Sequence, residues 1–256
     1  MLNPSSRESR LRLPRSGTRK TVLVTGGSRG IGRAVCLAFA RESWSVGIHY
    51  RERREEAELT CASVASLGGE GALFQADTRS AEQVRAMTEA FVDCWGRLDV
   101  LVCNAGQAVS GLLIRQDVEK WREVIETNLT GTFHCLQAAA VPMLRQRDGS
   151  IIVVGSYAAA HGDAGQAAYA ASKAGLVGLI RTVAREWGRS NIRLNIVYPG
   201  WHKTELAGEA MPDEANLDNH LLGRSPRLEE VAQTIVHLAL RRDVSGQVWN
   251  LDSRLV

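Results

Sequence analysis

The sequence has few of the features that indicate a bound metal, a disulfide framework, a membrane span or a nucleic-acid partner. Its cysteines form no Cys-x-x-Cys pair and show no metal-ligand spacing, so we assign no metal; they are Cys36, Cys61, Cys94, Cys103 and Cys135. An odd cysteine count is typical of free thiols in a reducing cytosol, which favours a cytoplasmic protein. No apolar run approaches the ~20 residues that cross a bilayer. The net charge of +3 is too small and too evenly spread to favour nucleic acid.

Short apolar runs alternate with helical patterns along most of the chain. Strands are predicted near 21–25, 45–50, 72–76, 98–103, 150–155, 192–197 and 246–251. Helices are predicted near 30–42, 53–67, 80–94, 117–146, 166–188 and 227–241. Such alternation implies right-handed crossovers and one parallel sheet of about seven strands with helices on both faces. A chain of 256 residues with 45% hydrophobic content can bury one such core, so we predict a single α/β domain over residues 20–256.

Two segments depart from this alternation. Residues 1–19 are rich in Arg and Ser, lack periodicity and contain Glu8 as their one acid, which predicts a disordered basic tail. An organellar transit peptide is the alternative, because such peptides are also Arg-rich, Ser-rich and poor in acids. Residues 205–222 carry Pro212 and many acids, so we expect an excursion from the sheet there.

A glycine turn follows the first predicted strand, with Gly26, Gly30 and Gly32 leading into a helix. Glycines let the backbone approach a pyrophosphate, and the helix N-terminus supplies N–H donors to the phosphates. The spacing Gly26-x3-Gly30-x-Gly32 differs from the commoner G-x-G-x-x-G. A tight turn without a ligand is the alternative. The turn favours a dinucleotide site on a Rossmann-type, doubly wound sheet.

Tyr169 and Lys173 lie four residues apart in a predicted helix, with Ser156 upstream. Positions i and i+4 share one face of a helix, so the phenol and the ammonium can point into one cleft. A neighbouring cation lowers the pKa of a phenol, which is ordinarily about 10. We expect this pair to donate a proton to a carbonyl oxygen. The alternative is an ordinary helix surface.

These segments, in this order from about Lys20 to about Asp252, resemble the classical short-chain dehydrogenases/reductases. The motifs that carry the resemblance are Thr25-Gly26-Gly27-Ser28-Arg29-Gly30-Ile31-Gly32, Cys103-Asn104-Ala105-Gly106, Thr127-Asn128-Leu129-Thr130-Gly131, Tyr169-x-x-x-Lys173 and Pro199-Gly200-Trp201-His202-Lys203-Thr204. Within that family the chain looks most like 3-oxoacyl-[acyl-carrier-protein] reductases of fatty acid biosynthesis. The stretches that support this narrower likeness are Gly165–Gly175 and Leu222-Gly223-Arg224.

The resemblance implies a catalytic set and a cofactor site. The implied catalytic residues are Ser156, Tyr169, Lys173 and Asn128. The implied cofactor-binding residues are Gly26, Ser28, Arg29, Gly30, Ile31, Tyr50, Arg51, Asp77, Thr78, Asn104, Ala105, Gly106, Tyr169, Lys173, Pro199, Gly200, His202 and Thr204. In the family, the segment that corresponds to 205–222 is a mobile lid over the substrate.

The end of the second predicted strand indicates which cofactor is used. An acid there would bind the ribose 2′-hydroxyl of NAD, whereas arginine accommodates a 2′-phosphate. Arg51 occupies this place, and Arg29 in the glycine turn is a second cation that can reach the phosphate. A solvated basic helix start is the alternative. Asp77 and Thr78 resemble the pair that contacts adenine, with a helix cap as the alternative. We therefore expect NADPH.

The expected reaction is the NADPH-dependent reduction of a 3-oxoacyl thioester to its 3-hydroxyacyl form. The alternatives are a reductase or dehydrogenase for a non-thioester ketone or alcohol, and a non-catalytic NADPH sensor or scaffold. The resemblance also implies a homotetramer and two basic residues beside the entrance for an acyl carrier protein. They fall on Arg147 and, shifted by one position, on Arg189.

Three residues depart from the family pattern. Cys103 replaces an Asn, and we expect only a small effect on catalysis. His202 occupies a position that is usually apolar, close to the expected nicotinamide amide. The Gly-Gly that usually follows Asp252 is missing, so the oligomer could differ from that of the family.

Overall fold

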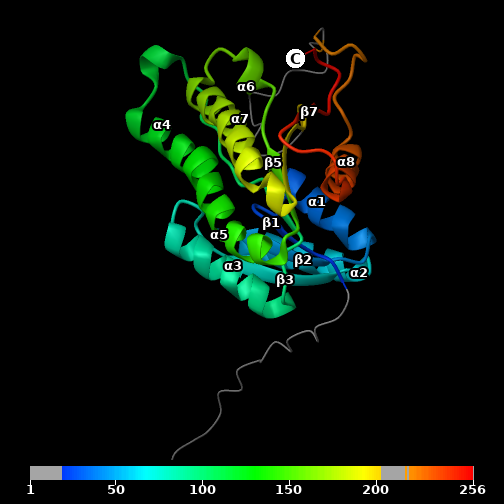
Figure 1. The fold of residues 1–256 in the computed structure, drawn as a ribbon. Helices are drawn as coiled ribbons and strands as arrows, with labels where there is room; N and C mark the ends of the chain where they lie inside the picture. The colour runs from blue at the N-terminus through cyan, green and yellow to red at the C-terminus, as the bar shows by residue number, and fades with distance from the viewer. Residues whose placement is uncertain (1–18, 203–216, 218, 256) are drawn as a thin grey trace, which may run out of the picture.

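The computed structural model describes residues 19–202, 217 and 219–255, and its centre is one sheet of seven parallel strands (Figure 1). Along the sheet the order is β3-β2-β1-β4-β5-β6-β7. The strands are β1 (Thr21–Val24), β2 (Ser45–Tyr50), β3 (Glu70–Gln75), β4 (Val100–Cys103), β5 (Gly149–Val154), β6 (Ile192–Tyr198) and β7 (Val248–Asn250). The chain runs outward from β1 to β3 and then returns to place β4 beside β1. This reversal opens a crevice at the carboxyl ends of β1 and β4.

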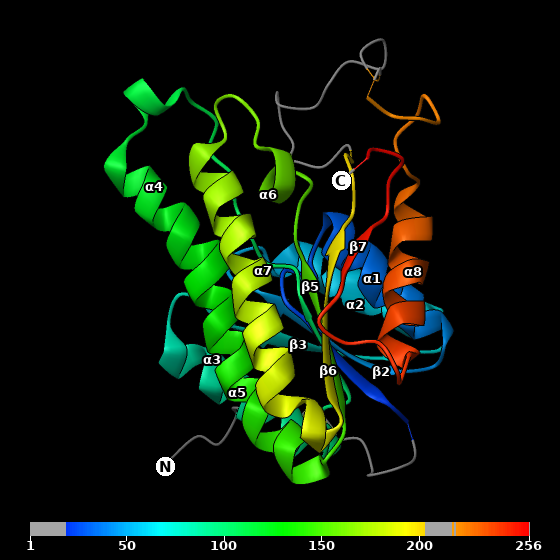
Figure 2. The same cartoon turned by 45° about the horizontal axis from the view of Figure 1, so that its top comes forward.

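Helices cover both faces of the sheet (Figure 2). The helices are α1 (Gly30–Arg41), α2 (Arg54–Ser66), α3 (Ala81–Trp95), α4 (Val118–Ile125), α5 (Gly131–Gln146), α6 (Ala158–His161), α7 (Ala167–Trp187) and α8 (Leu228–Leu240). One core packs α1, α2 and α8 against one face, and the other packs α3, α5 and α7 against the opposite face. Alternate β1 residues serve the two cores, with Val22 and Val24 in the first and Leu23 in the second.

The predicted α/β class, the parallel doubly wound sheet and its seven strands are confirmed. The helical pattern at 117–146 is divided by a π-turn, Glu126–Thr130, that lies between α4 and α5. Two short elements were not predicted, namely α6 and the 3-10 turn η1 (Leu113–Arg115); a second 3-10 turn, η3 (Gly188–Ser190), ends α7. They are too short to show a hydrophobic period.

Two predicted segments fall mostly outside the described residues. These are the basic tail at 1–19, of which Arg19 is described, and the excursion at 205–222, of which 217 and 219–222 are described. In the described part of the chain, no helix combines the length and apolar character that a membrane span requires.

Candidate active site

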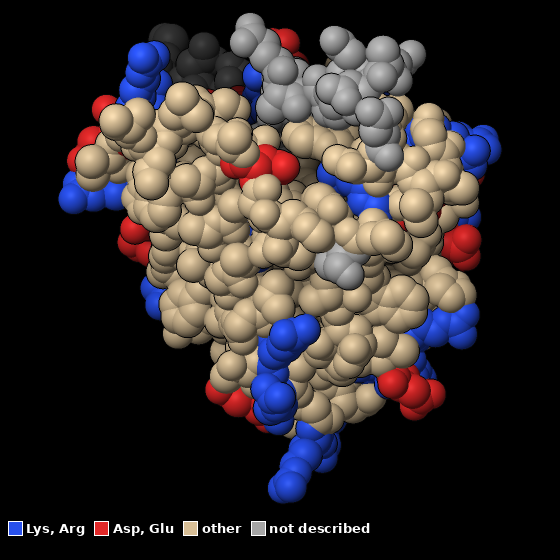
Figure 3. Space-filling view, turned by 90° about the horizontal axis from the view of Figure 1, so that it is seen from above, with Lys and Arg blue, Asp and Glu red and all other residues tan. Residues whose placement is uncertain are grey.

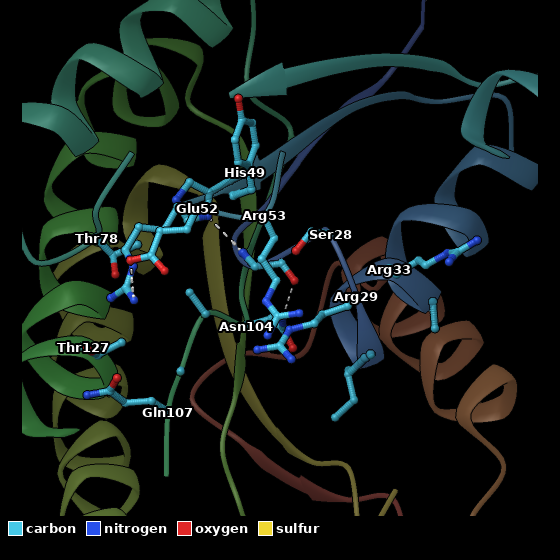
Figure 4. Close-up of a pocket in the computed structure, with 18 of the residues that line it drawn as sticks. Ser28, Arg29, Arg33, His49, Glu52, Arg53, Thr78, Asn104, Gln107 and Thr127 are labelled. Carbon is cyan, nitrogen blue, oxygen red and sulfur yellow. Dashed lines mark hydrogen bonds and ion pairs between the residues drawn. The ribbon is translucent and has the colours of Figure 1, made fainter. Parts of the chain in front are cut away.

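A cavity of about 860 Å³ lies at the carboxyl ends of β1, β2 and β4, where the chain reversal opens the sheet (Figure 4). The predicted cofactor residues that line it are Gly26, Ser28, Arg29, Gly30, Ile31, Tyr50, Arg51, Thr78, Asn104, Ala105 and Gly106. Lining residues that sequence reasoning did not single out include His49, Arg53, Gln107 and Thr127. The cavity therefore brings together segments from β1, β2, β4 and the π-turn.

The glycine turn is built for close backbone approach. Gly26 has φ +65°, a conformation that side chains disfavour. A Cβ at Gly32 would lie 2.1 Å from the carbonyl oxygen of Gly26, so no other residue fits there. The N-cap residue of α1, Arg29, makes no side-chain cap, which leaves the first N–H groups of the helix to an anion. These features fit the pyrophosphate of a dinucleotide.

Two side chains hold the turn in place from neighbouring strands. His49 at the end of β2 accepts a hydrogen bond at Nδ1 from the Gly26 N–H, at 3.0 Å. Its Nε2 lies 3.0 Å from the Ala76 carbonyl oxygen, which fixes Nε2 as the protonated nitrogen. Asn104 after β4 donates from Nδ2 to the carbonyl oxygens of Thr25 and Gly26, at 3.0 and 3.1 Å. His49 is buried, and burial lowers its pKa to about 4, so the ring is neutral.

Arginines gather on the β2 side of the cavity, as Figure 4 shows for Arg29 and Arg53. Burial lowers the pKa of Arg29, and the positive charge of Arg53 lowers it further. Arg51 lies 2.9 Å from Glu52, and Arg53 lies 3.1 Å from Glu56. Guanidinium groups that repel one another beside a cavity would be stabilised by an anion between them.

Asp77 and Thr78, which follow β3, have different surroundings. Thr78 is buried and lines the cavity. The Asp77 carboxylate instead pairs with Arg79, whose Nε lies 3.0 Å from each carboxylate oxygen. This pairing holds the pKa of Asp77 below its usual range. Asp77 is not among the described residues that line the cavity, and its carboxylate also accepts from the Arg79 N–H at 3.0 Å. The side chain that caps α3 is that of Ser80.

Asn128 sits in the π-turn and is completely buried. Its side-chain oxygen accepts from the Gln107 N–H at 2.8 Å, and its Nδ2 donates to the Gln107 carbonyl oxygen at 2.9 Å. The same Nδ2 donates to Ser172 Oγ at 2.9 Å, which ties the turn to α7. The extra residue of a π-turn is a frequent device at functional sites, because it redirects one side chain without ending the helix.

Tyr169 and Lys173 lie in the first half of α7, and Ser156 follows β5. The Lys173 ammonium lies 5.7 Å from the centroid of the Tyr169 ring and donates to the Val154 carbonyl oxygen at 2.7 Å. Burial raises the pKa of Tyr169, and a hydrogen bond with Ser156 lowers it. Burial also lowers the pKa of Lys173 to about 8.

The Lys173 ammonium bonds the backbone of β5 and lies over the Tyr169 ring, while the hydrogen bond that lowers the phenol pKa comes from Ser156. A further lowering of that pKa by Lys173 stays a prediction. The structure brings the three side chains together.

Pro199, Gly200 and His202 follow β6, on the opposite side of β5 from the glycine turn. The described lining of the cavity does not include them, nor does it include Tyr169 or Lys173. His202 is buried, its Nε2 lies 2.9 Å from the Pro199 carbonyl oxygen, and burial lowers its pKa. Thr204 lies outside the described residues.

Arg147 and Arg189 lie within this chain at the sheet edge opposite the cavity, so their expected role in docking a carrier stays a prediction. Arg147 precedes β5, and Arg189 lies in η3, just before β6. Both therefore sit at the amino ends of parallel strands, whereas the cavity lies at the carboxyl ends. The crossover topology places them there, because each helix returns the chain to the amino end of the next parallel strand.

Comparisons with known proteins agree with this geometry. The family model for short chain dehydrogenase matches residues 20–215, which is most of the chain. The chain belongs to the short-chain dehydrogenase family. It is thus an oxidoreductase, and its sequence is similar to proteins named 3-oxoacyl-[acyl-carrier-protein] reductase.

One such protein, FabG from Staphylococcus aureus strain Mu50, is 40% identical over 86% of this chain and 90% of its own length. The FabG of Thermotoga maritima is 38% identical over 93% of this chain and 98% of its own length. The crystal structure of a short-chain alcohol dehydrogenase from Sinorhizobium meliloti aligns with a TM-score of 0.87 at 30% identity, over 91% of this chain and 95% of that one.

Proposed function

We propose that the protein reduces the ketone of a 3-oxoacyl thioester to a secondary alcohol, using NADPH. The observation that carries the proposal is that Ser156, Tyr169 and Lys173 lie together, after the carboxyl end of β5 and in the first turns of α7. A cavity that fits a dinucleotide lies next to them. When bound, the reduced nicotinamide supplies a hydride to the carbonyl carbon. The protein must orient the ketone, provide a proton and exclude water.

Ser156 orients the carbonyl oxygen of the ketone, and Tyr169 protonates it. The Ser156 hydroxyl orients this oxygen and shares a hydrogen bond with the phenol. Because burial raises the pKa of Tyr169, the phenol keeps its proton at neutral pH and can donate it. The alcohol forms when the Tyr169 proton reaches the oxygen, and the charged Lys173 nearby stabilises the phenolate that is left.

Lys173 and Asn128 return a proton to Tyr169. Lys173 is buried and bonded to the Val154 carbonyl oxygen, and Asn128 anchors the adjoining Gln107 backbone. A Cβ at Gly106 would lie 3.1 Å from Asn128 Oδ1 and 3.7 Å from Lys173 Nζ, so the two side chains face the same small space. A water held there would link the ammonium to solvent.

The arginines beside the cavity support NADPH over NADH. Arg29, Arg51 and Arg53 line the part of the cavity next to β2, where the adenosine ribose would lie. A 2′-phosphate between Arg29 and Arg53 would relieve their mutual repulsion.

Exposed apolar residues support an acyl substrate. Figure 3 views the carboxyl-end face, which has a broad area without charged side chains. Exposed leucines and an isoleucine lie on segments of this side of the molecule, namely Leu112, Leu113, Ile114, Leu221 and Leu222. An acyl chain, delivered by coenzyme A or an acyl carrier protein, would cover part of this surface.

The proposal also includes a cytoplasmic homotetramer. The exposed apolar residues Phe133 and Val141 of α5 support an interface between subunits. Light scattering, which measures the mass in solution, tests it.

The proposal is tested by incubating the protein with NADPH and acetoacetyl thioesters and identifying the product by mass spectrometry. Formation of the 3-hydroxyacyl thioester is the expected result. Carrier-linked and coenzyme A-linked substrates are compared, since the two differ only in the carrier.

A second candidate, reduction of a non-thioester ketone, is favoured by the buried polar His202 near the expected nicotinamide amide. Turnover of a cyclic or sugar ketone but no thioester would select it. NADPH binding without turnover of any ketone would instead favour a sensor.

A further inference from the structure

A short segment near the C-terminus contacts three parts of the molecule near Ser156: the residue after Ser156, the segment before α8 and the turn after β6. We call Asn250–Arg254 the tail latch. Its Asp252 side chain is fully buried, and the Arg254 side chain is 8% exposed. Arg254 Nε donates to Asp252 Oδ2 at 2.8 Å, and a second guanidinium nitrogen donates to the same oxygen. This pair is buried and charge-assisted, so solvent and salt screen it less than an exposed ion pair.

The first contact of the tail latch is with the residue that follows Ser156. The Arg254 guanidinium lies over the Tyr157 ring, with its carbon 4.0 Å from the ring centroid. Tyr157 also stacks on His161, at 4.2 Å between ring centroids and 11° between planes. Planar guanidinium suits such stacking, which an ammonium or an aliphatic group does not reproduce. Arg254 therefore restrains the loop that carries the Ser156 hydroxyl.

The second contact is with the segment that leads into α8. The Leu221 N–H donates to the Ser253 carbonyl oxygen at 3.2 Å, and the Leu222 N–H to Ser253 Oγ at 3.3 Å. Neighbouring His220 is buried, with Nε2 3.9 Å from Asp252 Oδ2. Neither ring nitrogen of His220 has a hydrogen-bond partner among the described residues. A buried polar group left unbonded costs stability, which is typical of sites kept for function.

The third contact is with the turn after β6. A Cβ at Gly200 would lie 2.8 Å from the Asp252 Cβ, and Gly200 has φ +82°. The Pro199–Gly200 turn thus packs directly on the buried carboxylate residue. One ion pair joins the Ser156 loop, the Pro199–Gly200 turn and the segment at 220–222.

We propose that Arg254 is a positioning residue for the reaction. Together with Asp252 it holds the Tyr157 ring in position. Through Tyr157 it positions the Ser156 hydroxyl relative to the Pro199–Gly200 turn and residues 220–222. The inference rests on the proposed function, in which Ser156 orients the ketone. Arg254 is not among the described residues that line the cofactor cavity, so its loss should affect the reaction of the ketone more than the binding of NADPH.

The first test compares Arg254→Ala with Arg254→Lys and with Arg242→Ala, a matched arginine deletion. Arg242 is exposed, and among the described residues it pairs with Asp148 at 3.4 Å. We expect Arg254→Ala to raise the ketone KM and lower kcat, with kcat/KM reduced about tenfold or more, and to change the NADPH Kd less than about twofold. Arg254→Lys should be intermediate, because it keeps the charge but loses the fork and the stack. Arg242→Ala should resemble the wild type.

A double-mutant cycle tests whether Arg254 acts through Tyr157. Arg254→Ala, Tyr157→Ala and the double variant are compared in kcat/KM, with Tyr157→Phe as the control that keeps the ring. The expected result is strong non-additivity, with the double variant no worse than either single one. Additive losses, or a change in NADPH Kd as large as the change in ketone KM, would overturn the proposal.

Two measures separate this inference from the proposed function. If the wild type turns over no ketone, the proposed function fails, while the same cycle in melting temperature still decides whether Arg254 and Tyr157 are coupled. If Arg254→Ala does not fold, Asp252→Asn, which weakens the ion pair but keeps its shape, takes its place. Wild-type kinetics in a folded Asp252→Asn would contradict the positioning role.

Discussion

The two sides of the site are built in different ways. The nucleotide side is made by backbone: a glycine turn, the N-terminus of α1, and two side chains that hold the turn, His49 and Asn104. The substrate side is made by side chains that meet from distant parts of the chain, such as Tyr157 and Arg254. The nucleotide side therefore tolerates little substitution, whereas the substrate side can change which ketone it accepts.

Breaking the glycine turn should have the largest effect. In Gly32→Ala the new Cβ would lie 2.1 Å from the Gly26 carbonyl oxygen, so the turn must move. We expect NADPH affinity to fall by a factor of 100 or more, about 3 kcal/mol, as measured by fluorescence titration. The matched control is Gly178→Ala in α7, whose Cβ would meet no atom within 4 Å. That control should bind NADPH normally, and normal binding by Gly32→Ala would contradict the phosphate assignment.

His49 should make stability depend on pH. Its pKa is about 4 in the folded protein against an ordinary value of 6.5. Between these values the unfolded chain binds a proton that the folded protein does not, so stability is full above pH 6.5 and is lost as pH falls toward 4. The loss is about 3 kcal/mol at about 1.4 kcal/mol per pH unit.

Urea unfolding at neutral and acid pH measures this loss. His49→Asn should reduce it, because the amide does not titrate. An exposed control, His237→Asn in α8, should keep the wild-type pH dependence. An equal acid loss in His49→Asn would show that other groups cause it.

Removing the Arg29 side chain should reduce the preference for NADPH over NADH. A hydrogen bond to a charged partner contributes about 1.5–3 kcal/mol, so Arg29→Ala should weaken NADPH binding by roughly 10- to 100-fold. NADH, which lacks the 2′-phosphate, should bind as before. Arg227→Ala, which removes an exposed arginine paired with Glu230, is the control. Equal losses for both cofactors would show that Arg29 contacts another part of the dinucleotide.

The Lys173 ammonium should set the alkaline limit of activity. Burial lowers its pKa to about 8, so the group loses its proton as pH rises through about 8. Since the cation stabilises the phenolate that forms at Tyr169, kcat/KM for the ketone should fall by up to tenfold per pH unit above that point. A profile that stays flat well above pH 8 would rule out the charged lysine as the required form.

Changing the two arginines at the far edge of the sheet should have the smallest effect. Arg147 and Arg189 precede β5 and β6. We expect Arg147→Ala and Arg189→Ala to leave the KM for both carrier-linked and coenzyme A-linked substrates unchanged. A raised KM for the carrier-linked substrate alone would show that the carrier reaches this edge.

Most of the residues predicted to bind the cofactor line one cavity, and the sequence could indicate them because their signals are local. A glycine spacing and an apolar strand lie within a dozen residues, and the alternation of elements predicts a parallel sheet, although it does not fix that β4 lies beside β1. The role of His49 was missed because one histidine in a buried strand has no pattern around it. Its partners, Gly26 and Ala76, become neighbours only in the sheet.

The substrate side was predicted in part. The spacing of Tyr169 and Lys173 predicted that they lie together, but it did not predict the hydrogen bond from Lys173 to the Val154 carbonyl oxygen. The missing Gly-Gly after Asp252 was visible in the sequence. That Arg254 stacks on Tyr157 depends on the packing of the tail against β6 and α6, which no local pattern encodes.

The most direct test of the account is the rate of NADPH oxidation with acetoacetyl thioester, compared in the wild type and in Tyr169→Phe. Phenylalanine keeps the ring and removes only the hydroxyl that donates the proton. The account predicts that kcat falls by about 10²–10⁴-fold while the NADPH Kd is unchanged. A Tyr169→Phe variant that reduces the thioester at the wild-type rate would contradict it.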